Sequence, residues 1–133
     1  MLMMSQYMIL VIDDELDTIE LIQAAFKRSD CTVCGALNGC DGLQLAREQR
    51  PAIIMIDLML PGLDGFELCR QLRDDPLTTH IPRVILTARN SLTDQADALA
   101  AGADRYVVKP VRMKALVNLV ESLIGQKYLP PVN

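Results

Sequence analysis

The sequence lacks long apolar runs, an excess of positive charge and a recognisable leader. Its longest apolar segments are far shorter than the roughly 20 residues that a bilayer-spanning helix needs. With 13 basic and 17 acidic residues, and a net charge of −4, the chain has no electrostatic reason to bind nucleic acid or an anionic membrane directly. Residues 1–6 lack the basic start and the cleavage site of a secretory signal. We therefore expect a cytoplasmic protein.

The chain is also poor in the ligands that a structural zinc site requires. His80 is the single histidine, and the pair Cys31 and Cys34 has the C-x-x-C form without a second ligand pair. That pair lies in a β-branched stretch typical of a strand, where residues three apart face opposite sides at about 10 Å, beyond disulfide reach. We expect these two thiols, together with Cys40 and Cys69, to be reduced and buried.

The 133 residues, half of them apolar and 23% charged, fit one folded domain. Short apolar runs alternate with segments of helical periodicity. They predict strands at 7–12, 32–37, 53–56, 84–86 and 106–108, and helices at 15–29, 40–49, 65–74, 92–101 and 113–124. This alternation favours a parallel sheet with helices on both faces.

The same pattern predicts the boundaries of the domain. Residues 1–6 form an N-terminal lead, residues 7–125 form the domain, and residues 126–133 form a tail that begins where Gly125 closes the last helix. The prolines of this tail suit either the end of a single-domain protein or the start of a linker to a further domain.

Polar side chains gather where the predicted strands end, which is where folds of this class bind ligands. Asp13 and Asp14 follow the first strand, Asp57 the third, Thr87 the fourth and Lys109 the fifth. Converging carboxylates raise one another's pKa unless a cation lies among them. Carboxylate oxygens with free water positions suit Mg²⁺, which favours phosphate substrates. A lysine and a hydroxyl could hold phosphoryl oxygens while one carboxylate acts as nucleophile to give an acyl phosphate.

Four segments at these strand ends together resemble the receiver domain of the bacterial two-component response regulators. They are Val11-Ile-Asp-Asp-Glu15, Ile56-Asp-Leu-Met-Leu-Pro-Gly-Leu-Asp-Gly65, Ile85-Leu-Thr-Ala88 and Gly102-Ala-Asp-Arg-Tyr-Val-Val-Lys-Pro110. The resemblance runs from about residue 8 to residue 124. It implies a doubly wound α/β fold, a flavodoxin-like three-layer sandwich of five helices and a five-stranded parallel sheet in the order 2-1-3-4-5.

The resemblance also implies the metal and the phosphoacceptor. Asp57 corresponds to the aspartate that takes a phosphoryl group from a histidine kinase or a phosphotransfer protein. Mg²⁺, with Mn²⁺ as a possible substitute, would be held by the carboxylates of Asp13, Asp14 and Asp57 and by the backbone carbonyl of Met59.

Other family positions imply contacts to the phosphoryl group and a switch. Lys109 corresponds to the ion-pairing lysine, and its bond to Pro110 is one that is often cis in the family. The backbone N–H of Ala88 corresponds to a phosphoryl contact. Thr87 and Tyr106 occupy the switch positions, which act on the surface formed by the fourth helix, the fifth strand and the last helix. That surface would contact an output protein or a linked effector domain.

The resemblance thus predicts a regulatory domain, a monomer or weak homodimer, rather than an enzyme beyond self-phosphotransfer and autodephosphorylation. Two alternatives remain. One is a pseudo-receiver that binds proteins without phosphotransfer. The other is a haloacid-dehalogenase-type phosphatase, whose chemistry requires an aspartate two positions after the nucleophile, where this chain has Met59.

The chain departs from common family patterns at several positions. Val111 stands where many relatives have phenylalanine, and Arg105 and Leu119 replace a charged pair that a large transcription-factor subfamily uses for its dimer. Met59 and Arg89 occupy positions that tune phosphate lifetime in the family. A bulky apolar side chain and a guanidinium at these positions predict slow hydrolysis of the phosphorylated form.

Overall fold

The computed structural model describes residues 7–128, which alternate between five strands and five helices. In chain order the elements are β1 (Tyr7–Ile12), α1 (Leu16–Ala25), β2 (Cys31–Ala36), α2 (Gly39–Gln49), β3 (Ile53–Ile56), α3 (Gly65–Asp74), β4 (Arg83–Thr87), α4 (Leu92–Ala100), β5 (Arg105–Val108) and α5 (Met113–Tyr128). Every element predicted within the described residues is present, with boundaries shifted by a residue or two at most of the ends.

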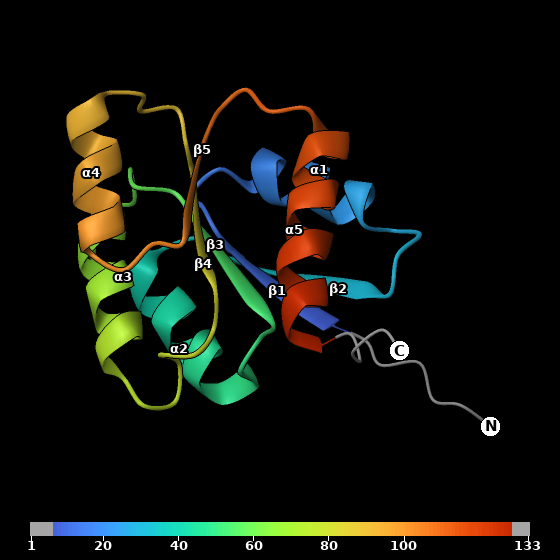
Figure 1. Ribbon diagram of the computed structural model, residues 1–133, viewed down its shortest axis with the longest axis horizontal. Coiled ribbons are helices and arrows are strands. Elements are labelled where there is room, and N and C mark those ends of the chain that lie inside the picture. Colours follow the sequence, from blue (N-terminus) through green and yellow to red (C-terminus); the bar gives the residue numbers. More distant parts are fainter. Residues whose placement is uncertain (1–6, 129–133) are drawn as a thin grey trace.

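The strands form one parallel sheet in the order β2-β1-β3-β4-β5. Helices α1 and α5 cover one face of this sheet, and α2, α3 and α4 cover the other (Figure 1). The predicted three-layer fold and strand order are therefore confirmed. Because all strands run the same way, their carboxyl ends meet at one edge of the sheet.

The core lies in two apolar clusters, one on each face of the sheet. The central strand β3 is buried throughout: Ile54 and Ile56 belong to the cluster beneath α2, α3 and α4, and Ile53 and Met55 to the cluster beneath α1 and α5. Such burial on both faces explains why the strand is a continuous apolar run.

Helix α4 contributes little to the core. Ala98 is the one buried residue among its nine, whereas Leu92 and Leu99 expose 82% and 52% of their surface. By contrast, α3 buries Leu68 and Leu72, together with other side chains, in the same cluster.

Helix α1 ends four residues before the predicted end at Ser29. The Ser29 hydroxyl donates to the carbonyl of Phe26 at 2.8 Å and accepts from the N–H of Cys31 at 3.2 Å. These bonds close a turn, as serine side chains do when they compete with helical bonding. Leu16 begins the helix and is 55% exposed, so the buried stripe starts at Ile19.

Helix α5 continues past Gly125 to Tyr128, so the predicted helix end at residue 124 is wrong. A glycine in a helix interior costs about 1 kcal/mol relative to alanine, which weakens a helix without stopping it. The rest of the predicted tail and the predicted lead, residues 1–6, lie outside the described residues. Among residues 7–128, no helix is long and apolar enough to cross a membrane.

The four cysteine thiols are free, but their burial differs. Cys69 is buried between α3 and the sheet, as predicted. Cys31 and Cys34 are partly exposed on β2, which forms an edge of the sheet, and Cys40 is exposed in the first turn of α2. The prediction of four buried thiols is therefore wrong at these three positions.

Candidate functional site

The sheet brings four of the predicted site residues together at its carboxyl edge. The backbone N–H of Asp13 donates to Ala36, and that of Asp57 donates to Ile12, each at 3.0 Å. These bonds extend the strand ladders by one residue and fix both aspartates directly beyond β1 and β3. In the same way, the N–H of Lys109 donates to the carbonyl of Thr87 at 2.8 Å and places the lysine beyond β5.

The Lys109 ammonium bridges the two buried aspartates. Its Nζ lies 2.7 Å from Asp13 Oδ2 and 3.0 Å from Asp57 Oδ2. The side chains of Asp13 and Asp57 are only 2% and 7% exposed, and that of Lys109 is 19% exposed. The bond between Lys109 and Pro110 is cis, as the resemblance implied. The positive charge of the lysine thus offsets the negative charges of two carboxylates that are buried too deeply for water to solvate.

Asp57 is held by three hydrogen-bond donors. Its Oδ1 accepts from the Thr87 hydroxyl at 2.8 Å and from the N–H of Met59 at 2.9 Å, and its Oδ2 faces Lys109. Burial alone would raise the pKa of Asp57, but these bonds outweigh burial and hold the pKa below its usual value. Asp57 is therefore an ionised carboxylate near neutral pH.

The two partners of Asp57 in this charge cluster titrate differently. Burial raises the pKa of Asp13, and the bonds from Lys109 and from the N–H of Glu15 only partly oppose that rise. Burial would lower the pKa of Lys109, but its bonds to the two aspartates outweigh burial and raise it. The lysine therefore stays charged, as a residue that neutralises anions must.

An acidic cluster at the end of β1 has the chemistry of a site for a hard divalent cation. Carboxylate oxygens of Asp13, Asp14 and Glu15 all lie within 4.8 Å of one another. All of these potential ligand atoms are oxygens, and the exposure of Asp14 and Glu15 leaves room for water ligands. Both features fit Mg²⁺ or Mn²⁺. Glu15 was not among the metal ligands predicted from the sequence. Asp57 lies outside this group and joins it through Lys109.

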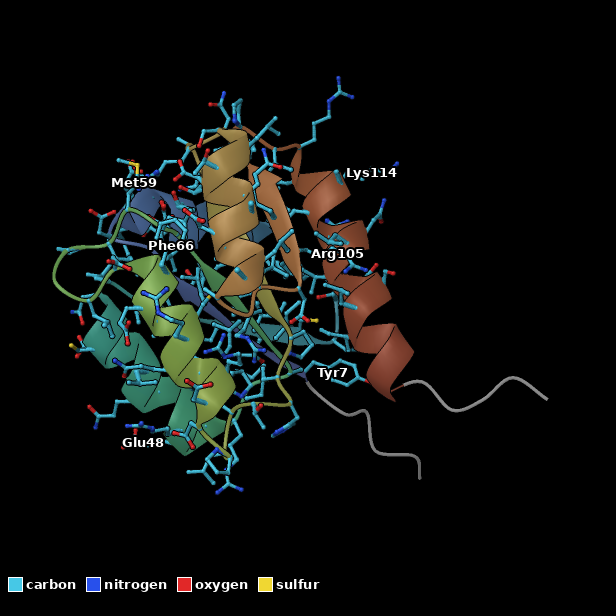
Figure 2. The ribbon with its side chains drawn as sticks, turned by 60° about the vertical axis from the view of Figure 1, so that its left-hand side comes forward. Tyr7, Glu48, Met59, Phe66, Arg105 and Lys114 are labelled. Carbon is cyan, nitrogen blue, oxygen red and sulfur yellow. The ribbon has the colours of Figure 1, made fainter. Side chains whose placement is uncertain are left out.

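The loop after β3 exposes Met59 beside Asp57. Its side chain is 57% exposed and projects outward at the edge of the molecule (Figure 2). The loop closes at Gly65, where a Cβ atom would lie 2.6 Å from the carbonyl oxygen of Asp57. Only glycine allows α3 to start this close to the strand end, and this approach keeps the loop beside Asp57.

The loop after β4 links the predicted switch residues through Arg89. The Tyr106 hydroxyl donates to the carbonyl of Arg89 at 2.8 Å, and the N–H of Arg89 lies 3.4 Å from Thr87 Oγ1. The Arg89 guanidinium binds both oxygens of Asp94 and lies 5.7 Å from the centre of the Phe66 ring. The contacts to Asp94 and Phe66 were not predicted from the sequence.

The comparisons with known proteins agree with this geometry. Residues 9–121 match the response regulator receiver domain. The chain belongs to this family. The receiver domain is 44% identical over 116 residues to the transcriptional regulatory protein AfsQ1 of Streptomyces coelicolor, and 39% identical over 115 residues to the response regulator PleD of Caulobacter vibrioides. These matches cover 87% and 86% of this chain but only 50% and 25% of the two relatives, so the chain spans about half and a quarter of their lengths.

Solved structures show the same receiver fold. A response regulator from Chloroflexus aurantiacus has a TM-score of 0.85 at 29% identity, with 91% of this chain and 99% of that chain covered. The receiver domain of a sensor histidine kinase from Pseudomonas aeruginosa has a TM-score of 0.83 at 27% identity, with the same coverage. That protein was crystallised with a magnesium ion coordinated in its active-site cleft.

Proposed function

We propose that this receiver domain is a phosphorylation-controlled switch in which Asp57 accepts a phosphoryl group from the phosphohistidine of a histidine kinase or phosphotransfer protein. The observation that carries the proposal is the bridge from Lys109 to Asp13 and Asp57 at 2.7 and 3.0 Å. Together with the bonds from the Met59 N–H and the Thr87 hydroxyl, it keeps Asp57 ionised, and it leaves a cation beside the place where phosphoryl oxygens would arrive. Such a cation stabilises the charge of the transferring group.

In the transfer, an Asp57 carboxylate oxygen attacks phosphorus while the bond from phosphorus to the histidine nitrogen breaks. The nitrogen keeps the bonding electron pair, and the product is an acyl phosphate on Asp57. Lys109 pairs with the incoming phosphoryl oxygens. The Thr87 hydroxyl and the N–H of Ala88 donate to the other phosphoryl oxygens.

The residues that would hold the divalent cation are Asp13, Asp14, Asp57 and the carbonyl of Met59. Asp13 and Asp14 belong to the acidic cluster at the end of β1, where Glu15 offers an additional carboxylate. When bound, Mg²⁺ or Mn²⁺ supplies positive charge to the phosphoryl oxygens. The three carboxylates at the end of β1 repel one another in the absence of a cation, so this part of the chain favours binding it.

Phosphorylation would add roughly two negative charges at the carboxyl edge of the sheet. Thr87 and Tyr106 would pass this change to the surface of α4, β5 and α5, which then alters its affinity for an output protein or a linked effector domain. The domain would act in the cytoplasm, as a monomer or weak homodimer, and its chemistry would be limited to self-phosphotransfer and autodephosphorylation.

Mass spectrometry of the intact protein after incubation with acetyl phosphate and Mg²⁺ tests the proposal. We expect one added phosphoryl group on the wild type and none on Asp57→Asn. Asp30→Asn is the matched control, because Asp30 is an exposed aspartate before β2, at the opposite edge of the sheet. An unmodified wild type would favour the pseudo-receiver, and steady turnover of a phosphomonoester would favour the phosphatase.

A further inference from the structure

Arg89 makes two kinds of contact that point in different directions. Its backbone belongs to the candidate phosphorylation site: the N–H lies 3.4 Å from Thr87 Oγ1, and the Thr87 hydroxyl itself donates to Asp57. Its side chain turns away to Asp94 in the first turn of α4, with Nε to Oδ2 at 3.0 Å and Nη2 to Oδ1 at 2.8 Å. Two parallel bonds of this kind define the orientation of the guanidinium.

Phe66, in the first turn of α3, forms a second support for the guanidinium. The carbon at the centre of the Arg89 guanidinium lies 5.7 Å from the centre of the Phe66 ring, within range of a cation–π contact. Figure 2 shows Phe66 beside α4, and Phe66 lines a groove together with Ala100 and Ala101 at the end of that helix. The arginine is therefore held between the starts of two helices.

The holding contacts are exposed, so they can be exchanged. The side chain of Arg89 is 42% exposed and that of Asp94 is 16% exposed. An ion pair this open to water contributes little to stability, because solvent screens the attraction. A dianionic phosphoryl group on Asp57 would be a stronger partner for the guanidinium than a single carboxylate, since guanidinium binds phosphate in the same bidentate way.

We infer that Asp94 and Phe66 form a holder that keeps the Arg89 guanidinium away from Asp57, and that a phosphoryl group on Asp57 competes with Asp94 for it. The inference rests on the proposed function of Asp57. In the resting state the arginine ties the loop after β4 to the first turn of α4. In the phosphorylated state it leaves Asp94 and covers the phosphoryl group.

This exchange links the state of Asp57 to two measurable properties. Hydrolysis of the acyl phosphate, in which water attacks phosphorus and Asp57 leaves as the carboxylate, slows when the guanidinium covers the phosphorus. The start of α4 loses its tie to the loop at the same time. A weaker holder should therefore lengthen the life of the phosphorylated form.

The test measures the rate at which phosphorylated protein loses its phosphoryl group in Mg²⁺-containing buffer after the donor is removed. The variants are Asp94→Asn, Arg89→Gln, and the double variant with both changes. Asp97→Asn is the matched control, because Asp97 is an exposed aspartate one turn further along α4. We expect Asp94→Asn to lengthen the half-life about two- to five-fold, the range that corresponds to an exposed ion pair.

The double variant separates competition from a structural effect of Asp94. We expect Arg89→Gln to shorten the half-life, the double variant to behave as Arg89→Gln does, and Asp97→Asn to match the wild type. The proposed role of Asp94 and Phe66 as a holder would be overturned if Asp94→Asn lengthened the half-life equally with and without Arg89, or left it unchanged. Asp57 would remain the acceptor in either case. If the wild type accepted no phosphoryl group at all, the proposed function would fail and the holder with it.

The Arg89 Nε–H signal in NMR spectra provides a direct readout. We expect it to be slow to exchange in the unmodified wild type and to change position on phosphorylation. In Asp94→Asn, we expect the signal to reach that second position only after phosphorylation. An Nε–H signal that did not respond to phosphorylation would overturn the exchange of partners.

Discussion

The hydroxyl of the fully buried Thr87 donates to Asp57 Oδ1 at 2.8 Å. The contact joins the ends of β4 and β3 within the candidate site. It means that one oxygen of the proposed acceptor is already oriented by a neighbouring strand before any phosphoryl group arrives.

Replacing Thr87 by valine tests this contact, because valine has the same shape without the hydroxyl. We expect Thr87→Val to be less stable than the wild type by about 1–3 kcal/mol, since a buried carboxylate oxygen loses a donor. Chemical denaturation at neutral pH without Mg²⁺ measures the difference. Thr87→Ser keeps the hydroxyl and should lose less stability. Equal stability of the valine and serine variants would show that the bond contributes nothing.

Removing the Lys109 charge should destabilise the domain, because it leaves the buried carboxylates of Asp13 and Asp57 facing each other. We expect Lys109→Met to lose about 1–3 kcal/mol of the free energy of unfolding at neutral pH. Adding Asp13→Asn to that variant removes one of the two charges and should restore part of the loss. A double variant less stable than Lys109→Met would argue against charge repulsion as the cause.

Asp14 offers a way to separate metal binding from folding. Its side chain is exposed at the end of β1, so Asp14→Asn should unfold at nearly the wild-type temperature without metal. At a hundredfold excess of Mg²⁺ over its dissociation constant, the wild type should gain about 2.7 kcal/mol of stability. Thermal unfolding with Mg²⁺ and with chelator measures this gain. The asparagine variant should gain much less, whereas Asp30→Asn should respond as the wild type does.

The cysteines should differ sharply in reactivity. Burial raises the pKa of Cys69 from its ordinary value of 9.0 to about 12, whereas Cys40 is exposed. A thiol-reactive probe at pH 8 should label Cys40 rapidly and Cys69 only after unfolding, as peptide mapping would show. Because the folded state holds the Cys69 proton more tightly, this thiol favours folding below pH 9, and its contribution is lost as the pH rises towards 12. Labelling of Cys69 at the rate of Cys40 in native protein would contradict its burial.

Met59 should influence how long the phosphorylated form lasts. Its exposed apolar side chain lies two residues after Asp57 and obstructs water more than a small polar side chain would. We expect Met59→Asn to hydrolyse faster than the wild type, and Arg89→Ala to do so as well. The decay of phosphorylated protein, followed by mass spectrometry, measures both. A Met59→Asn variant that retained the wild-type half-life would count against the predicted shielding.

The strands and the gathering of charge at their ends were predictable from local signals. Ile53–Ile56 is predicted without error because four apolar residues in a row can only form a strand buried on both faces in this context. The placement of Asp57 and Lys109 follows from parallel strand direction alone. The order of the strands, however, came from the resemblance to the family, because periodicity does not specify which strands are neighbours.

The missed features depend on contacts that no local pattern contains. The end of α1 depends on the Ser29 hydroxyl, and the spacing of the apolar residues carries no information about that hydrogen bond. The contact of Arg89 with Phe66 joins residues more than 20 positions apart, and their pairing follows from how α3 and α4 pack. The continuation of α5 beyond Gly125 reflects a modest helical penalty that the rest of the helix overcomes.

The scant anchoring of α4 has a mechanical consequence. One buried methyl group, that of Ala98, is worth about 1 kcal/mol of apolar burial, whereas tilting α3 would expose two leucines and a cysteine. The free energy gained or lost with one surface ion pair is therefore comparable to the burial that holds α4 in place. It is far smaller than the burial that holds α3. Among the helices over this face of the sheet, α4 is the one whose position can be set by charge.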